Sequence, residues 1–174
     1  QTIATRFSTG AIFSYGNSTV APYSEQFYVG GANSIRAFTV RSLGPGSYQP
    51  KNDKYSFIDQ SGDFKLEMNM EWRFRLIKAL QGAIFFDAGN IWLLNKDTNR
   101  PGASLEELTS FKQFINQIAL GSGFGIRYDL GYFVVRGDVG IGLHVPYQTG
   151  VSGYYNMPDF WKSVDFHLAI GYPF

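Results

Sequence analysis

One arginine of this chain lies in a largely apolar stretch, where its charge would need a partner. Arg36 follows a pair of glycines and has mainly apolar neighbours: Gly30, Gly31, Ile35, Ala37 and Phe38. Burying a guanidinium is costly unless carboxylates pair with it. Glu71 and Asp87 occupy matching inward positions in two later segments and are the candidate partners. The pattern predicts an ion-pair anchor for the loop, and the alternative is an ordinary arginine in a solvated loop.

Other residue types argue against catalysis and cofactor binding. The chain has two histidines, His144 and His167, without a nearby nucleophile motif or a ligand spacing such as His-x3-His. It has no cysteine, which excludes disulfides and thiolate metal sites. The net charge is +1 and the basic residues are scattered, so nothing indicates a nucleic-acid partner. We therefore expect no enzyme activity, no metal and no cofactor.

The elements that position these charges are six segments in which apolar residues alternate with polar or small ones. This period is typical of strands with one apolar face. In the clearest segment Met68 and Trp72 share one face, and Glu67 and Glu71 share the other. At ~3.3 Å per residue and ~40° tilt, segments of this length span roughly the 30 Å of a bilayer core. The segments are 2–15, 63–76, 82–94, 117–129, 132–144 and 164–174.

The last of these segments keeps its alternation up to the final residue of the sequence. A terminal strand of this kind is common in bacterial outer-membrane barrels and rare in soluble proteins. Pro173 lacks a backbone donor, and proline in sheets belongs at edges. We therefore expect a weakly paired seam at this end of the strand. The apolar residues of this terminal strand include Phe166, Leu168, Ile170, Tyr172 and Phe174.

The connections between the segments alternate in length. Short turns are expected near 78–81 and 130–131, and long loops at about 16–62, 95–116 and 145–162. Outer-membrane barrels have short periplasmic turns and long outer loops, which would place the C-terminus in the periplasm. Ser104 and Glu107 have capping-box spacing and predict a short helix in the second long loop.

Two further sets of residues fit a barrel wall. Inward charges on the fourth and fifth segments are expected to form a structural ladder: Arg127, Asp129, Arg136 and Asp138. Aromatic residues make up 17% of the chain and are expected as girdles near the strand ends. The expected girdle residues are Trp72, Phe74, Tyr128, Phe133, Tyr172 and Phe174 at one end, and Phe13 and Trp92 at the other.

The predicted fold is all-β, a transmembrane antiparallel β-barrel. Six strands are too few to close a membrane barrel, for which eight is the practical minimum. An open sheet in lipid would leave unpaired edges. The sequence begins without Met or a signal peptide, as expected for a mature or truncated piece. We expect residues 1–174 to be the C-terminal portion of a single barrel domain.

Several motifs, in order along the chain, resemble those of the BamA/TamA-like outer-membrane assembly superfamily (the bacterial surface antigen family). Residues 35–38 resemble its Val-Arg-Gly-Phe/Tyr loop motif, with Ala37 in place of the usual glycine. Residues 85–92 resemble its Phe-x-Asp-x-Gly strand motif, and residues 70–74 its glutamate-bearing strand. Residues 123–129 and 135–138 resemble its penultimate hairpin. If position 37 requires a positive φ, Ala37 is costly there.

The resemblance implies a role. It makes this chain strands eleven to sixteen of a sixteen-stranded barrel, preceded by POTRA domains, with Arg36 reaching Glu71 and Asp87 in the lumen. It implies outer-membrane protein assembly or translocation through a seam between the first and last strands. The implied partners are outer-membrane lipid, unfolded outer-membrane or secreted client proteins, and periplasmic or lipoprotein subunits. Open alternatives are a passive porin-like channel, a two-partner secretion exporter and a barrel enzyme, for which no catalytic constellation is found.

Overall fold

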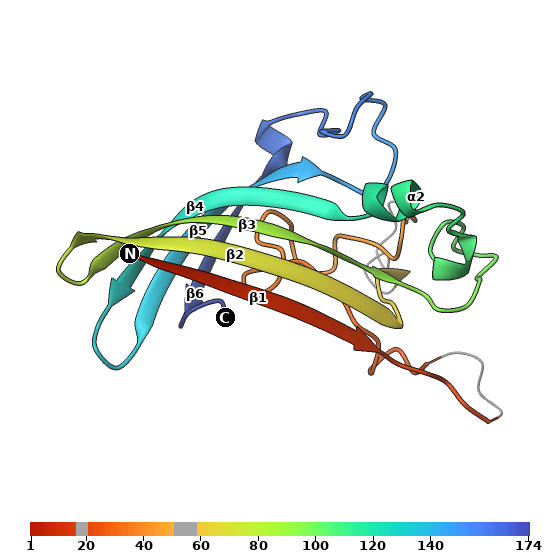
Figure 1. Ribbon diagram of the computed structural model, residues 1–174, viewed down its shortest axis with the longest axis horizontal. Helices are drawn as coiled ribbons and strands as arrows, with labels where there is room; N and C mark the ends of the chain where they lie inside the picture. The colour runs from red at the N-terminus through yellow and green to blue at the C-terminus, as the bar shows by residue number, and fades with distance from the viewer. Residues whose placement is uncertain (17–20, 51–58) are drawn as a thin grey trace.

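The computed structural model describes residues 1–16, 21–50 and 59–174. Six strands form one antiparallel sheet in which each strand pairs with the next along the chain (Figure 1). They correspond to the six alternating segments, so the prediction of an all-β, antiparallel chain is confirmed. The strands are β1 (Thr2–Ala11), β2 (Phe64–Ile77), β3 (Leu80–Trp92), β4 (Ala119–Asp129), β5 (Val134–His144) and β6 (Val164–Ile170).

The sheet is strongly curved, and its two faces differ in chemistry. On the outer face, large apolar side chains such as Phe7, Met68 and Phe124 are exposed. On the inner face, charged side chains such as Glu71 and Arg127 are fully buried. Part of the connection between β1 and β2, within residues 21–50, lies over this inner face, inside the curve of the sheet (Figure 1). The period of two in the sequence therefore separates an apolar exterior from a buried polar interior.

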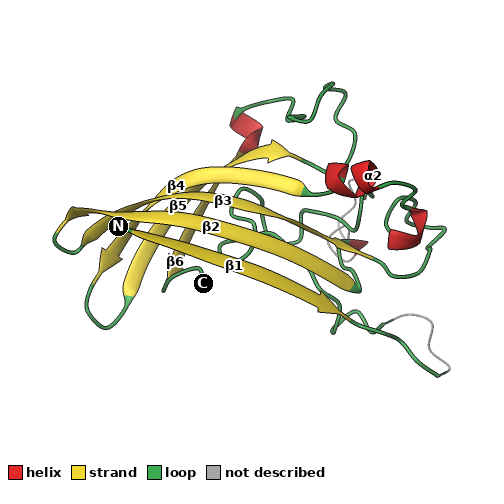
Figure 2. Ribbon diagram, in the orientation of Figure 1, coloured by secondary structure: helices red, strands yellow, loops and turns green. Residues whose placement is uncertain are grey.

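Short helices occur in the long connections between β3 and β4 and between β5 and β6 (Figure 2). They are η1 (Leu105–Glu107), α2 (Phe111–Asn116) and η2 (Trp161–Ser163). The backbone N–H of Ser104 donates to Glu107 Oε2 at 3.4 Å, so the short helix predicted there is confirmed. None of the helices among the described residues is long and apolar enough to cross a membrane.

Trp92 was expected as an exposed girdle residue, and that expectation is wrong. Its side chain is fully buried at the end of β3. The indole stacks on Phe114 of α2 with ring centroids 5.1 Å apart, and it also contacts Phe64 of β2. Its Nε1–H donates to Gln117 Oε1 at 2.7 Å. The helical connection after β3 folds back over this residue, which strand periodicity does not reveal.

We expect Trp92→Ala to lower the free energy of unfolding by about 3–5 kcal/mol, because it removes a large buried ring from a packed cluster. Trp92→Phe keeps the stacking on Phe114 but leaves the Gln117 amide oxygen without its donor, so about 1–3 kcal/mol should be lost. Thermal unfolding in detergent, followed by circular dichroism, measures both. Equal losses in the two variants would contradict this account of the hydrogen bond.

The chain leaves the sheet before its last residues. β6 ends at Ile170, and Gly171 has a φ of +90°. The tail segment (Gly171–Phe174) turns from β6 toward the inside of the sheet (Figure 1). The expectation of a strand that continues to Phe174 is therefore wrong for these four residues. Pro173 lies outside the strand ladder and is buried, so its missing N–H does not weaken the pairing of β6.

Candidate functional site

The loop tip (residues 30–38) is a compact turn built on two glycines. Gly30 and Gly31 have φ values of +99° and +93°, which side chains rarely adopt. A Cβ at Gly30 would lie 2.1 Å from the carbonyl oxygen of Thr39. Among the described residues, the positive-φ non-glycine is Arg41. Ala37 therefore does not occupy a left-handed conformation, and the backbone cost considered for it does not arise.

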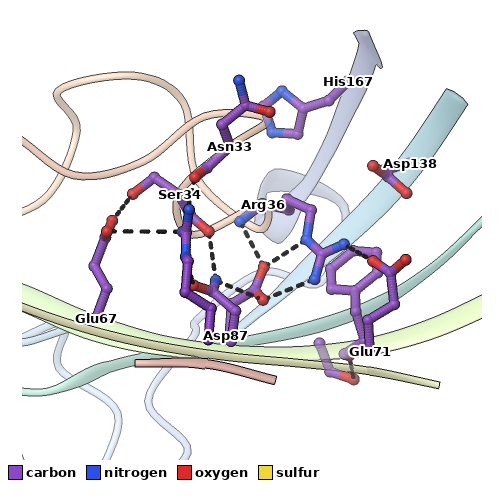
Figure 3. Close-up of polar contacts among 12 residues, drawn as sticks. Asn33, Ser34, Arg36, Glu67, Glu71, Asp87, Asp138 and His167 are labelled. Carbon is purple, nitrogen blue, oxygen red and sulfur yellow. Dashed lines mark hydrogen bonds and ion pairs between the residues drawn. The ribbon is translucent and has the colours of Figure 1, made fainter. Parts of the chain in front are cut away.

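Arg36 projects from the loop tip onto the inner face of the sheet, between Glu71 of β2 and Asp87 of β3 (Figure 3). Its Nε and Nη2 donate to the two oxygens of Asp87 at 2.8 and 2.9 Å, and its backbone N–H donates to the same carboxylate at 3.0 Å. Its Nη1 donates to Glu71 Oε2. The guanidinium carbon lies 3.7 Å from the ring centroid of Phe85. All three charged side chains are fully buried.

Glu71 also links the loop anchor to the neighbouring strands. Arg127 of β4 donates to it at 2.9 and 3.2 Å, and Arg73 of β2 donates to it at 2.7 Å. Arg127 also pairs with Asp138 of β5, which accepts a bond from Arg136 at 2.7 Å. The inward ladder predicted from the sequence is therefore present for Arg127, Arg136 and Asp138.

Asp129 does not belong to this ladder. Its carboxylate accepts the backbone N–H of Gly131 at 2.8 Å, in the turn between β4 and β5. Turn residues with short carboxylate side chains commonly bond backbone groups two residues on. Asp129 is the last residue of β4, so its side chain bonds to the turn and not to the inward charges.

A second group of contacts fixes the beginning of the loop tip. Asn69 of β2 donates to the carbonyl oxygen of Ser34 at 2.7 Å and to Asp87 at 2.9 Å. Arg6 of β1 donates to the carbonyl oxygen of Asn33 at 2.8 Å. The Ser34 hydroxyl donates to Glu67, next to the Arg36 cluster (Figure 3). The loop tip is thus bonded to side chains of β1, β2 and β3.

Glycines on β4 and β5 make room for the loop tip. A Cβ at Gly140 would lie 2.1 Å from the carbonyl oxygen of Arg36, and one at Gly121 would lie 2.2 Å from the Cβ of Ala37. For both of these glycines the closest neighbour is therefore the loop tip. Their absent side chains allow the backbone of the loop to contact the sheet directly.

The site is a charged structural network. Burial alone would lower the pKa of Arg36, but hydrogen bonds and ion pairs with Asp87 and Glu71 outweigh it and raise that pKa above its usual value. Arg36 therefore stays charged at any physiological pH. Among residues 1–16, 21–50 and 59–174, no group of three or more His, Asp or Glu side chains is arranged to hold a metal ion. The arrangement can fix a loop, and it presents no nucleophile–base pair.

The structure brings together most of the residues singled out in the sequence, and it adds others. Arg36, Glu71 and Asp87 meet, and Ile35, Ala37 and Phe38 belong to a buried apolar cluster. Sequence reasoning missed the parts played by Asn69, Arg73 and Glu67. Their signal was present, because all three share the inward face of β2 with Glu71. The contacts of Phe85 and Gly140 had no comparable signal.

The sheet is curved and antiparallel, its exposed face is apolar, and a loop with a buried charge packs against its other face. These features are typical of the wall of a membrane β-barrel. The chain belongs to the Omp85 superfamily, because the domain profile of that superfamily matches residues 1–174. The resemblance drawn from its motifs is thereby confirmed.

A curated relative gives a second comparison. Over 83 residues the chain is 30% identical to outer membrane protein assembly factor BamA of Neisseria meningitidis serogroup B (strain ATCC BAA-335 / MC58). The aligned part is 45% of this chain and 10% of that protein. The chain thus corresponds to only a small part of the length of this relative.

Proposed function

We propose that this chain is the C-terminal portion of a sixteen-stranded β-barrel in the bacterial outer membrane, and that the barrel assembles or translocates outer-membrane proteins. Membership of the Omp85 superfamily and similarity to an assembly factor support this function. The structural observation that carries it is the Arg36 anchor, which holds a loop inside the curve of the sheet. Short turns at the β2–β3 and β4–β5 ends suit the periplasmic side, with the C-terminus there.

The proposed mechanism involves no covalent chemistry. β6 pairs with β5 on one side, and its other edge is unpaired within the described chain. In the whole barrel this edge would meet the first strand at a seam that opens laterally. Client strands would then pair with the exposed edge through backbone hydrogen bonds, as in other β-strand additions. Lipid, unfolded clients and periplasmic or lipoprotein subunits are the proposed partners.

The test uses the full-length protein in liposomes that receive a urea-unfolded outer-membrane barrel protein. We expect the client to become folded and protease-resistant faster than in empty liposomes. Asp87→Asn should reduce the acceleration, because Arg36 loses the charge of its main partner. Asp97→Asn is the matched control, since Asp97 pairs with Arg100 in a surface loop.

The same liposomes separate the alternatives. A steady ionic conductance without client folding would identify a passive channel. Passage of the client into the vesicle interior, without insertion, would identify an exporter of the two-partner type. Either result would overturn the assembly function and leave the structural account of the anchor intact.

A further inference from the structure

The tail segment lies among the arginines of the inner face. The guanidinium carbons of Arg6, Arg36 and Arg73 lie 5.3, 5.8 and 5.9 Å from the ring centroid of Phe174. Arg73 also lies 4.3 Å from the ring centroid of Tyr172 and donates to the carbonyl oxygen of Phe174 at 3.4 Å. These arginines come from β1, the loop tip and β2. The ring of Phe174, at the end of β6, therefore contacts β1, β2 and the loop tip, although β1 and β2 lie at the opposite edge of the sheet from β6.

The charges of the network explain why an aromatic ring is favourable at this position. Ion pairs join four arginine side chains to three carboxylate side chains, so the side chains of this network carry one positive charge in excess. The face of an aromatic ring has negative potential and attracts guanidinium groups within about 6 Å. The ring of Phe174 and its carbonyl oxygen both offer negative potential to Arg73. The arginines are Arg36, Arg73, Arg127 and Arg136, and the carboxylates are Glu71, Asp87 and Asp138.

Arg73 provides the connection from the tail to the loop anchor. Its Nε donates to Glu71 Oε1, and the other oxygen of Glu71 accepts from Arg36. A displacement of Phe174 would remove the contact of its ring with Arg36 and its contacts with Arg73, and Arg73 shares Glu71 with Arg36. The loop tip and the end of β6 therefore have a common set of contacts.

We propose that Phe174 is a positioning residue for the loop tip, and that its ring couples the end of β6 to the Arg36 anchor. The contacts of Phe174 do not depend on the proposed function, but the role of this coupling rests on it. In that role, a terminal strand that moves at the seam would loosen the loop tip, and a docked loop tip would hold the terminal strand in place. By linkage the coupling acts equally in both directions. A π face, rather than apolar volume alone, is the property that this position requires.

The experiment measures the loop tip directly in the full-length protein. Ile35→Cys places a thiol at a fully buried position of the loop tip, in a chain that has no cysteine of its own. Any cysteines elsewhere in the protein are first replaced by serine. We expect Phe174→Leu, which keeps apolar volume but lacks a π face, to raise the rate of maleimide labelling roughly tenfold. Phe174→Trp should leave the rate close to that of the parent.

Phe166→Leu is the matched control. It is the same substitution of phenylalanine by leucine, but Phe166 lies on the exposed face of β6, away from the arginines. It should not change labelling. Unchanged labelling in Phe174→Leu, or equal increases in Phe174→Leu and Phe174→Trp, would overturn the proposal. Because labelling needs no client protein, it can succeed where the liposome assay fails. The two hypotheses are therefore distinguishable.

Discussion

Arg36→Ala should release the loop tip and lower the free energy of unfolding by about 3–5 kcal/mol, the usual cost of leaving a buried charge without its partner. Most of this cost should come from Asp87, which would lose its only cationic partner among the described residues. Glu71 keeps Arg73 and Arg127, whereas Asp87 keeps only the amide of Asn69 among its side-chain partners here. Thermal unfolding in detergent and maleimide labelling of the Ile35→Cys thiol measure stability and loop position separately.

Two further variants sharpen this prediction. Arg36→Lys should be almost as damaging, because an ammonium group cannot reproduce the forked bonds to Asp87 and Glu71. The double variant Arg36→Ala with Asp87→Ala should be more stable than Arg36→Ala alone, since it removes the orphaned carboxylate.

The control for this prediction is Arg100→Ala, which breaks a partly exposed pair with Asp97 and should cost about 0–1 kcal/mol. If Arg36→Ala is no more harmful than Arg100→Ala, the anchor does not stabilise the loop.

Local pattern was enough to predict the strands and the facing of their side chains. The inward residues of β2 follow from the period of two, and so does the place of Glu71 opposite a buried arginine. The pattern failed where another element intervenes. Trp92 has the parity of an outer residue, but α2 covers it. The tail alternates like a strand, yet Gly171 turns it inward toward the arginines. Both outcomes depend on contacts distant in sequence.

The loop tip shows the same distinction within the site. That Arg36 needs carboxylates is a property of its chemistry, so its partners could be inferred from the sequence. That Gly140 and Gly121 lie under Arg36 and Ala37 depends on register across three strands. A glycine in a strand signals a close approach of some neighbour without identifying it. The shape of the docking surface therefore required the structure, whereas its charge did not.

The last prediction concerns this surface shape. Gly140→Ala should expel the loop tip and lower the free energy of unfolding by about 1–3 kcal/mol or more. The new Cβ would lie 2.1 Å from the carbonyl oxygen of Arg36, a backbone atom with little freedom to move. Labelling of the Ile35→Cys thiol should rise accordingly. Gly137→Ala is the matched control on β5, since the nearest atom to its Cβ is 3.8 Å away. It should leave both labelling and stability nearly unchanged.

Gly121 allows a test of the contact itself. Gly121→Ala would place its Cβ 2.2 Å from the Cβ of Ala37, so it too should displace the loop. Ala37→Gly removes the opposing atom and should restore docking in the double variant, whereas it should not rescue Gly140→Ala, whose closest conflict is with the carbonyl group of Arg36. Rescue of both, or of neither, would contradict this geometry. Selective rescue would show that the loop is held by the fit of its backbone to glycines as well as by the charge of Arg36.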